Sequence, residues 1–211
     1  MKKSLMYVML VFAVLFGAVA SASAQSKALE KDVKKRVKEL KKEGWTLQAS
    51  ASTLDYALLK YRMYMEEDEE NRIALTGIAT GKNVKIGREN AIVNGITSYA
   101  GRAKAQVVGK MKTIISADSS TGASEEEIDK FGAAYESGVN AKIGALVKQH
   151  FVLVRDLGNG TKEFNVFMSI DESAAKKARE EAAQEAKKQA ALGNLSQQVE
   201  EFIGEPVEAE E

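Results

Sequence analysis

A single proline, Pro206, occurs among the 211 residues, and the chain contains no cysteine. Proline interrupts helices and is excluded from central strands, so a chain almost without it can form long, continuous elements. The lack of cysteine means that no disulfide can hold together a loop-rich scaffold. We therefore predict long helices and strands whose stability comes from the burial of a hydrophobic core.

The first 25 residues have the order of a secretory signal peptide. Met-Lys-Lys precedes an apolar run over residues 5–20, and Ala22, Ser23 and Ala24 precede Gln25. A membrane anchor is the alternative, but 16 apolar residues are fewer than the roughly 20 that a spanning helix needs. We expect a signal peptide over residues 1–24, cleavage after Ala24, and a periplasmic or secreted protein with no stable membrane insertion after cleavage.

Charge argues against a nucleic-acid partner. From Gln25 onward the chain has 28 basic and 30 acidic residues, whereas binding to a phosphate backbone calls for a surplus of basic residues. The remaining length is that of one domain of ordinary size. We predict a single domain over residues 25–192, followed by an acidic C-terminal tail over residues 193–211 that is expected to be disordered.

Apolar periodicity predicts two helices in the N-terminal third. Residues 26–43 have one apolar residue per helical turn among many charged ones, and Gly44 is a natural stop. A second helix begins at Ser52 or Thr53 and runs to Met65. The acidic run over residues 66–70 is interpreted as a solvated helix end or loop, because such runs repel themselves.

A strand and a long helix follow in the middle of the chain. Residues 72–81 predict a strand with glycines at a bend and at its end. Residues 84–115 carry a continuous apolar stripe at helical spacing, which predicts the longest helix. Gly101, Ala105 and Gly109 lie beside that stripe at four-residue spacing, and we expect another element to pack closely against them.

The C-terminal half predicts a helix, a hairpin and a polar helix. Ser124 and Glu127 form a capping-box pattern. Two strands, residues 146–155 and 163–170, flank a loop containing Asn-Gly, a strong hairpin signal. Asp171 or Ser173 is then expected to cap a last helix that runs to about residue 192. The expected fold is α+β: a small antiparallel sheet of three or four strands packed against long helices, with polar flanking helices.

No pattern in the sequence predicts a catalytic residue, a cofactor site or a metal site. His150 is the only histidine, and a structural or surface role is the preferred interpretation. Residues 77–83 resemble a phosphate-binding loop, but they have three residues between the glycines instead of four, and Asn83 in place of the hydroxyl. Residues 118–122 with Glu127 lack the alternating oxygen ligands of a calcium-binding EF-hand loop.

The order of strand, long helix, second helix, Asn-Gly hairpin and polar helix resembles the LPP-twenty type of bacterial envelope lipoproteins. The residues that carry the likeness lie within residues 72–180: Ile78-Ala79-Thr80-Gly81, the helix over 91–108, and the hairpin over 151–168 followed by Ala174-Ala175. The resemblance implies a compact α+β envelope domain without an assigned reaction. This chain departs from the family because it lacks the lipid-bearing cysteine, and Gln25 stands where that cysteine would be.

We therefore expect a non-catalytic exported envelope protein that acts by interaction with another envelope protein or by structural support, as a single chain or a homo-oligomer. Two alternatives remain open. One is a small apolar ligand bound on the face that carries Tyr56, Tyr61, Met63, Tyr64 and Met65. The other, less favoured, is a hydrolase that uses carboxylates of residues 66–70 or Asp118 in a cleft.

Overall fold

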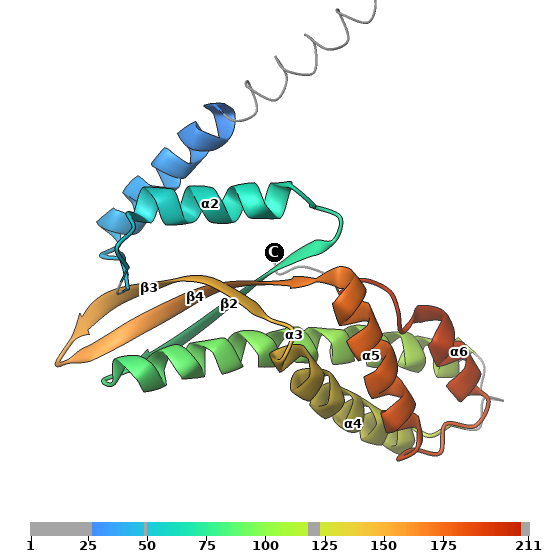
Figure 1. The fold of residues 1–211 in the computed structure, drawn as a ribbon. Helices are drawn as coiled ribbons and strands as arrows, with labels where there is room; N and C mark the ends of the chain where they lie inside the picture. Colours follow the sequence, from blue (N-terminus) through green and yellow to red (C-terminus); the bar gives the residue numbers. More distant parts are fainter. Residues whose placement is uncertain (1–26, 49, 118–122, 208–211) are drawn as a thin grey trace, which may run out of the picture. The chain divides into compact units, whose positions relative to one another are not determined.

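The computed structural model describes residues 27–48, 50–117 and 123–207 (Figure 1). The predicted signal peptide, its cleavage site, Asp118 and the last four residues lie outside this part of the chain. Two compact units make up the molecule, Met1–Tyr64 and Met65–Glu211, called the first and second unit below. None of the helices in the described residues is both long and apolar enough to span a membrane.

The first unit contains a helix over residues 27–42, the short strand β1 (Thr46–Leu47) and most of helix α2 (Leu54–Glu66). Gly44, with a φ of 84°, ends the first helix as expected. The hydroxyl of Thr53 accepts a hydrogen bond of 3.3 Å from the amide of Tyr56 and so caps α2. The predicted apolar stripe of the first helix is buried throughout: Leu29, Val33, Val37 and Leu40.

The second unit is built on the antiparallel strands β2 (Arg72–Gly81), β3 (Lys148–Gly158) and β4 (Thr161–Asp171). β4 lies between the other two, with Val166 opposite both Gly77 of β2 and Val152 of β3. The predicted hairpin is confirmed: Asn159 and Gly160 both have positive φ, 53° and 71°, as a two-residue hairpin turn requires. Both strands extend closer to the turn than the sequence pattern indicated.

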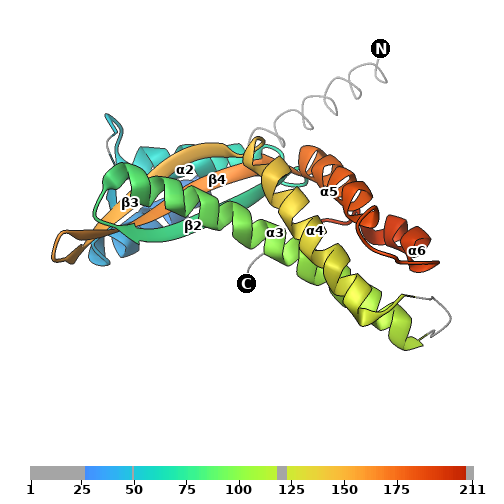
Figure 2. The same cartoon turned by 90° about the horizontal axis from the view of Figure 1, so that it is seen from below.

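Helices cover one face of this sheet. α3 (Val84–Ala117) lies along β2 and β4, α4 (Glu125–Gly144) packs on α3, and α5 (Glu172–Lys187) packs on α4. Figure 2 shows α3 continuing beyond the strands, with α4 beside its C-terminal half. The side chains that fill the space between sheet and helices include Leu75, Tyr99, Met111, Phe131, Tyr135, Phe164 and Met168. The predicted α+β fold, with a small antiparallel sheet on long helices, is confirmed.

Glycines let α3 approach the sheet at backbone distance. A Cβ on Gly77 of β2 would lie 1.8 Å from the carbonyl oxygen of Ala91, and one on Gly95 would lie 2.9 Å from the carbonyl oxygen of Thr76. On Gly87, it would lie 2.2 Å from the ring of Phe164. The close contact of α3 therefore uses Gly87, Ala91 and Gly95.

The predicted close contact is wrong at Ala105 and Gly109, whereas Gly101 is half-buried and lies near Glu136 of α4. Gly109 and Ala105 are exposed, and a Cβ built on Gly109 meets no described atom within 4 Å. The spacing of small residues was informative, but it did not show how far along the helix the sheet extends.

The prediction of a disordered tail from residue 193 is also wrong for most of its length. Residues Leu195–Phe202 form helix α6, in which Leu195, Val199 and Phe202 are buried. Ile203 and Val207 beyond the helix are buried as well and belong to the same core. One apolar residue per turn within an acidic segment was the signal for this helix. The predicted domain boundaries at residues 25 and 192 otherwise stay a prediction.

Candidate binding groove

The second unit has an open groove of about 970 Å³ between the C-terminal half of α3 and the segment that contains α6. α3 contributes one wall and its floor, and Glu201, Phe202 and Glu205 form the opposite wall. The residues of α3 that line it are Arg102, Ala105, Gln106, Gly109, Lys110, Thr113 and Ile114. The groove therefore combines small, apolar and charged side chains on two elements.

The floor of the groove continues the side of α3 that packs on the sheet. An α-helix completes five turns in about 18 residues, so Ala105 and Gly109 lie directly in line with Gly87 and Ala91. At Gly87 and Ala91 this line of small residues lies so close to the sheet that a Cβ on Gly87 or on Gly77 opposite Ala91 would overlap its neighbours. At Ala105 and Gly109 it is exposed. The groove is thus the part of this surface that extends past the strands.

Polar contacts fix the wall formed by α6 and the residues after it. The ammonium group of Lys110 forms an ion pair with Glu205 and lies 5.6 Å from the centre of the Phe202 ring. The side-chain amide of Gln106 donates a hydrogen bond of 3.1 Å to the carbonyl of Pro206. Both contacts hold the C-terminal segment against α3.

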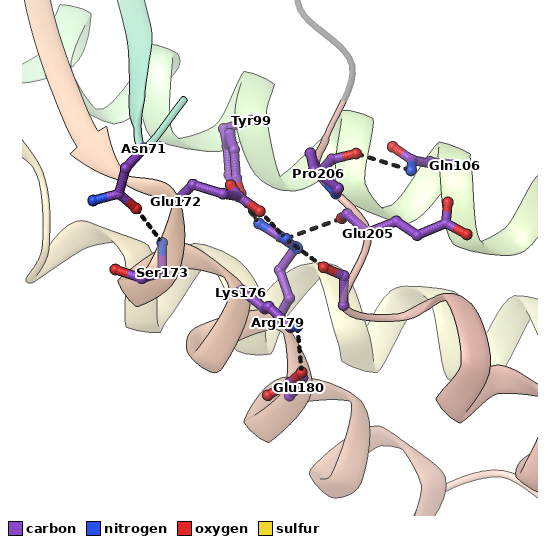
Figure 3. Close-up of polar contacts among 11 residues, drawn as sticks. Asn71, Tyr99, Gln106, Glu172, Ser173, Lys176, Arg179, Glu180, Glu205 and Pro206 are labelled. Atoms are coloured by element: carbon purple, nitrogen blue, oxygen red, sulfur yellow. Dashed lines mark hydrogen bonds and ion pairs between the residues drawn. The ribbon is translucent and has the colours of Figure 1, made fainter. Parts of the chain in front are cut away.

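Arg179 of α5 anchors the same segment from inside the fold (Figure 3). Its guanidinium donates to the carbonyl oxygens of Gly204 and Glu205 at 3.2 and 2.9 Å, and to the phenol oxygen of Tyr99 at 2.6 Å. The carboxylate of Glu172 accepts two further bonds from the guanidinium, at 2.5 and 3.3 Å. Arg179 is 1% exposed, and two of the groups that satisfy its buried charge are main-chain carbonyls of the segment that forms the groove wall.

The pKa values of this network follow from burial. Burial lowers the pKa of the Arg179 guanidinium, but its hydrogen bond to Glu172 and the neighbouring Tyr99 outweigh that effect, so its pKa is raised. Burial raises the pKa of Tyr99, although Arg179 opposes the shift, and burial also raises the pKa of Tyr135. At neutral pH the arginine is therefore charged and both phenols are protonated.

The cap of α5 comes from a residue that the sequence pattern did not indicate. Asp171, at the N-cap position, makes no side-chain cap hydrogen bond. Instead, the side-chain oxygen of Asn71 accepts a bond of 3.0 Å from the amide of Ser173, and its main-chain oxygen accepts one of 2.7 Å from Glu172 (Figure 3). Asp171 thus occupies the predicted N-cap position, but the capping hydrogen bond comes from a side chain about 100 residues away along the chain.

His150 has a serine partner that its sequence position did not reveal. His150 lies at a β-bulge in β3, and its Nε2 atom lies 2.7 Å from the hydroxyl oxygen of Ser169 in β4. The Ser169 residue is 1% exposed, so a substrate has no access to its hydroxyl. The pair gives two polar side chains of the sheet a hydrogen-bond partner.

The other candidate motifs have structural roles where the structure describes them. Residues 77–81 belong to β2, and the side-chain oxygen of Asn83 caps α3 by accepting bonds of 2.9 and 3.1 Å from the amides of Lys85 and Ile86. Ser124 caps α4 as predicted, at 3.2 Å from the amide of Glu127. The carboxylate of Glu127 does not complete the capping box and instead accepts a bond of 2.7 Å from the amide of Ala191.

Acidic and aromatic clusters of the sequence do not converge on a cleft. All five residues of the acidic run 66–70 are exposed. Along α2, Tyr56 and Met63 are exposed whereas Tyr61 is buried, so these residues do not lie on one face of the helix. Within residues 27–48, 50–117 and 123–207, no three histidine, cysteine or acidic side chains are grouped so that they could hold a metal ion.

The groove of α3 and α6 has hydrogen-bond donors and acceptors along its walls and the small residues Ala105 and Gly109 on α3. Two of its charged groups, Lys110 and Glu205, form an ion pair with each other. Comparisons of the chain with protein-family models, curated proteins and solved structures gave no match, so the likeness to LPP-twenty lipoproteins stays a prediction.

Proposed function

We propose that this chain is a non-catalytic exported protein of the bacterial envelope, and that it binds another envelope protein through the groove between α3 and α6. The observation that carries the proposal is the exposed line of Ala105 and Gly109. The same line, five turns earlier, accepts a sheet at backbone distance. A surface without side-chain bulk lets a helix or strand of a partner pack equally closely, which favours a protein over a small molecule as the ligand.

The walls of the groove support a protein partner as well. Phe202 and Ile114 offer apolar contact, while Gln106, Thr113 and Glu201 offer polar contact at the edges. Apolar centres with polar rims are typical of protein interfaces. The groove wall is held by the buried Arg179 network, so a partner meets a formed surface. Structural support of the envelope is the related role if the partner is itself a fixed envelope component.

Site-specific photocrosslinking tests this function. A photoreactive amino acid is placed at Thr113 in the groove or at Ala141, an exposed residue of α4 outside it. Envelopes of cells that produce each variant are irradiated, and adducts of the tagged chain are isolated. We expect a discrete adduct from the groove position that is absent from the Ala141 position.

A blocking variant provides the matched control. Gly109→Arg fills the groove at a site where a new Cβ meets no described atom within 4 Å, and Ala141→Arg adds the same charge elsewhere. The adduct should disappear with Gly109→Arg and persist with Ala141→Arg. Identical adducts from both positions would contradict the proposal. An adduct from the groove position that persists in the Gly109→Arg variant would contradict it as well. So would a hydrolytic activity of the purified protein that a point mutation removes.

A further inference from the structure

Charge is divided unevenly between the two units. Residues 27–64 contain ten basic and five acidic residues, whereas residues 65–211 contain 18 basic and 25 acidic residues. The basic surplus of the first unit comes from the helix over residues 27–42 (blue in Figure 1), which has eight basic residues and three acidic ones. An overall charge near zero therefore conceals a strongly basic element.

The helix presents this charge on one continuous face. Five exposed lysines at helical spacing form the face, together with Glu30, and they border a shallow concavity of about 520 Å³. Successive residues of a helix are turned by about 100°, so these lysines lie opposite the buried stripe of Leu29, Val33, Val37 and Leu40. We call this surface the lysine face: Lys27, Lys31, Lys34, Lys35 and Lys38.

Glu30 lies among the five lysines, which leaves the face strongly positive. The ion pairs of the first unit join Arg36 to Glu39, Lys41 to Asp55 and Arg62 to Asp32. None of them uses a lysine of the face. From Lys27 to Lys38 the face spans about 17 Å of a straight helix, so all five ammonium groups can touch one plane at the same time.

We propose that the lysine face binds the anionic headgroup surface of a phospholipid bilayer. The apolar stripe of the helix is buried in the fold, so contact is made by the ammonium groups with lipid phosphates, and the helix does not insert. Basic residues near such a surface attract it additively. This inference rests on the export proposed above, which brings the chain to a membrane-bounded compartment.

The composition of the face favours lipid over nucleic acid. Single-stranded nucleic acids are held by aromatic side chains on which bases stack, together with basic groups, and residues 27–42 contain no aromatic residue. Arginine is preferred where phosphate is recognised in a fixed geometry, and all five residues of the face are lysines. Non-directional point charges suit a fluid layer of headgroups.

Vesicle binding tests the proposal on the chain from Gln25 to Glu211, which retains every described residue and lacks the apolar run. Vesicles of phosphatidylcholine, with and without about 30% phosphatidylglycerol, are sedimented with the protein at low salt and at high salt. We expect binding to the anionic vesicles at low salt, loss of binding at high salt, and no binding to phosphatidylcholine alone. Absence of binding to anionic vesicles at low salt would overturn the proposal.

Two variants of equal charge locate the surface. One replaces Lys31, Lys34, Lys35 and Lys38 by glutamine, which has a similar helix propensity; the control replaces Lys82, Lys85, Lys177 and Lys188, four exposed lysines of the second unit. The first should weaken binding at least about tenfold and the second less than about twofold. An equal loss in both would show that net charge alone drives binding and would overturn the assignment.

Two further measurements distinguish a lipid surface from a nucleic acid or a second copy of the chain as the partner of the lysine face. If single-stranded DNA binds more tightly than the anionic vesicles and depends on the same lysines, the face serves a polyanion and the lipid proposal fails. If the chain self-associates at low salt and the lysine variant does not, the acidic second unit of another copy is the partner instead. Inorganic phosphate at matched ionic strength should not displace the protein from vesicles.

Discussion

Arg179 of α5 donates a hydrogen bond of 2.6 Å to the phenol oxygen of Tyr99 on α3, and both residues are almost fully buried. The same guanidinium also donates hydrogen bonds to the carboxylate of Glu172 and to the carbonyl oxygens of Gly204 and Glu205. One buried cation therefore connects α3, α5 and the C-terminal segment that forms a wall of the groove.

Replacement of this arginine should loosen that wall and destabilise the fold. In Arg179→Met, Glu172 and the phenol of Tyr99 lose a partner in the interior, which typically costs about 3–5 kcal/mol of the free energy of unfolding. Urea unfolding measures the loss. Limited proteolysis should also cut the chain after α6 in the variant before it cuts the wild-type chain.

The double variant Arg179→Met with Glu172→Leu is the control for this interpretation. It removes the cation and its main counter-charge together, so no buried carboxylate is left uncompensated. It should recover a large part of the lost free energy. If the double variant is less stable than Arg179→Met alone, the ion pair is not the source of the effect.

Removal of the hydroxyl group from two buried tyrosines should change the free energy of unfolding in opposite directions. The hydroxyl of Tyr135 has no hydrogen-bond partner among the described residues, and a buried unsatisfied polar group costs about 1–3 kcal/mol. We expect Tyr135→Phe to raise the free energy of unfolding and Tyr99→Phe to lower it, because the latter takes a partner from Arg179. Urea unfolding of both variants decides this, and a stability loss in Tyr135→Phe would point to a partner for its hydroxyl.

High pH should unfold the protein through the same buried phenols. Burial raises the pKa of Tyr61 to about 12 and raises those of Tyr99 and Tyr135. A raised pKa means that the fold favours the neutral form, so this stability is fully present below the ordinary pKa of about 10 and is lost as the pH rises above it. Tyrosinate absorbance and circular dichroism should therefore change together above pH 10, and separate transitions would contradict the coupling.

The elements of this fold could be predicted from the sequence because their signals are local. Periodicity gave α3, the Asn-Gly pair gave the hairpin of β3 and β4, and Ser124 gave the start of α4. α6 was missed because its eight residues lie within the segment assigned to the acidic tail, although its apolar residues are at helical spacing.

The groove and its supports could not be predicted, because they depend on pairs far apart in the chain. Asn71 caps α5 about 100 residues later, and Arg179 meets Tyr99 from 80 residues away. Small residues at four-residue spacing indicated that something packs on α3. Only the length of the strands decides that Gly95 is covered and Gly109 is exposed.

Acid should weaken the contacts between the loop after α5 and its neighbours. Hydrogen bonds from Lys130 and from the amide of Ala191 lower the pKa of Glu127, and bonds from Lys187 and Gln184 lower that of Glu200. A lowered carboxyl pKa contributes stability above the ordinary value, and this stability is lost as the pH falls through the shifted pKa.

Urea midpoints measured from neutral pH to about pH 3 test this expectation. The urea concentration at the wild-type midpoint should decrease when the pH is lowered below the ordinary pKa of a glutamate, about 4.3. Glu127→Gln should make this decrease of the midpoint smaller. Glu43→Gln, at an exposed helix end, should leave the decrease unchanged. A wild-type midpoint that does not depend on pH in this range would show that neither carboxylate supports the fold.

Alanine at two glycines near α3 should have opposite effects, and the contrast tests the central relationship between the sheet and the groove. A Cβ on Gly77 would overlap the carbonyl oxygen of Ala91 at 1.8 Å. Gly77→Ala should therefore force β2 and α3 apart and cost about 3 kcal/mol or more. A Cβ on Gly109 meets no described atom within 4 Å, so Gly109→Ala should raise the free energy of unfolding by up to about 1 kcal/mol through helix propensity. Urea unfolding measures both, and a loss of stability in Gly109→Ala would mean that another part of the chain occupies the groove.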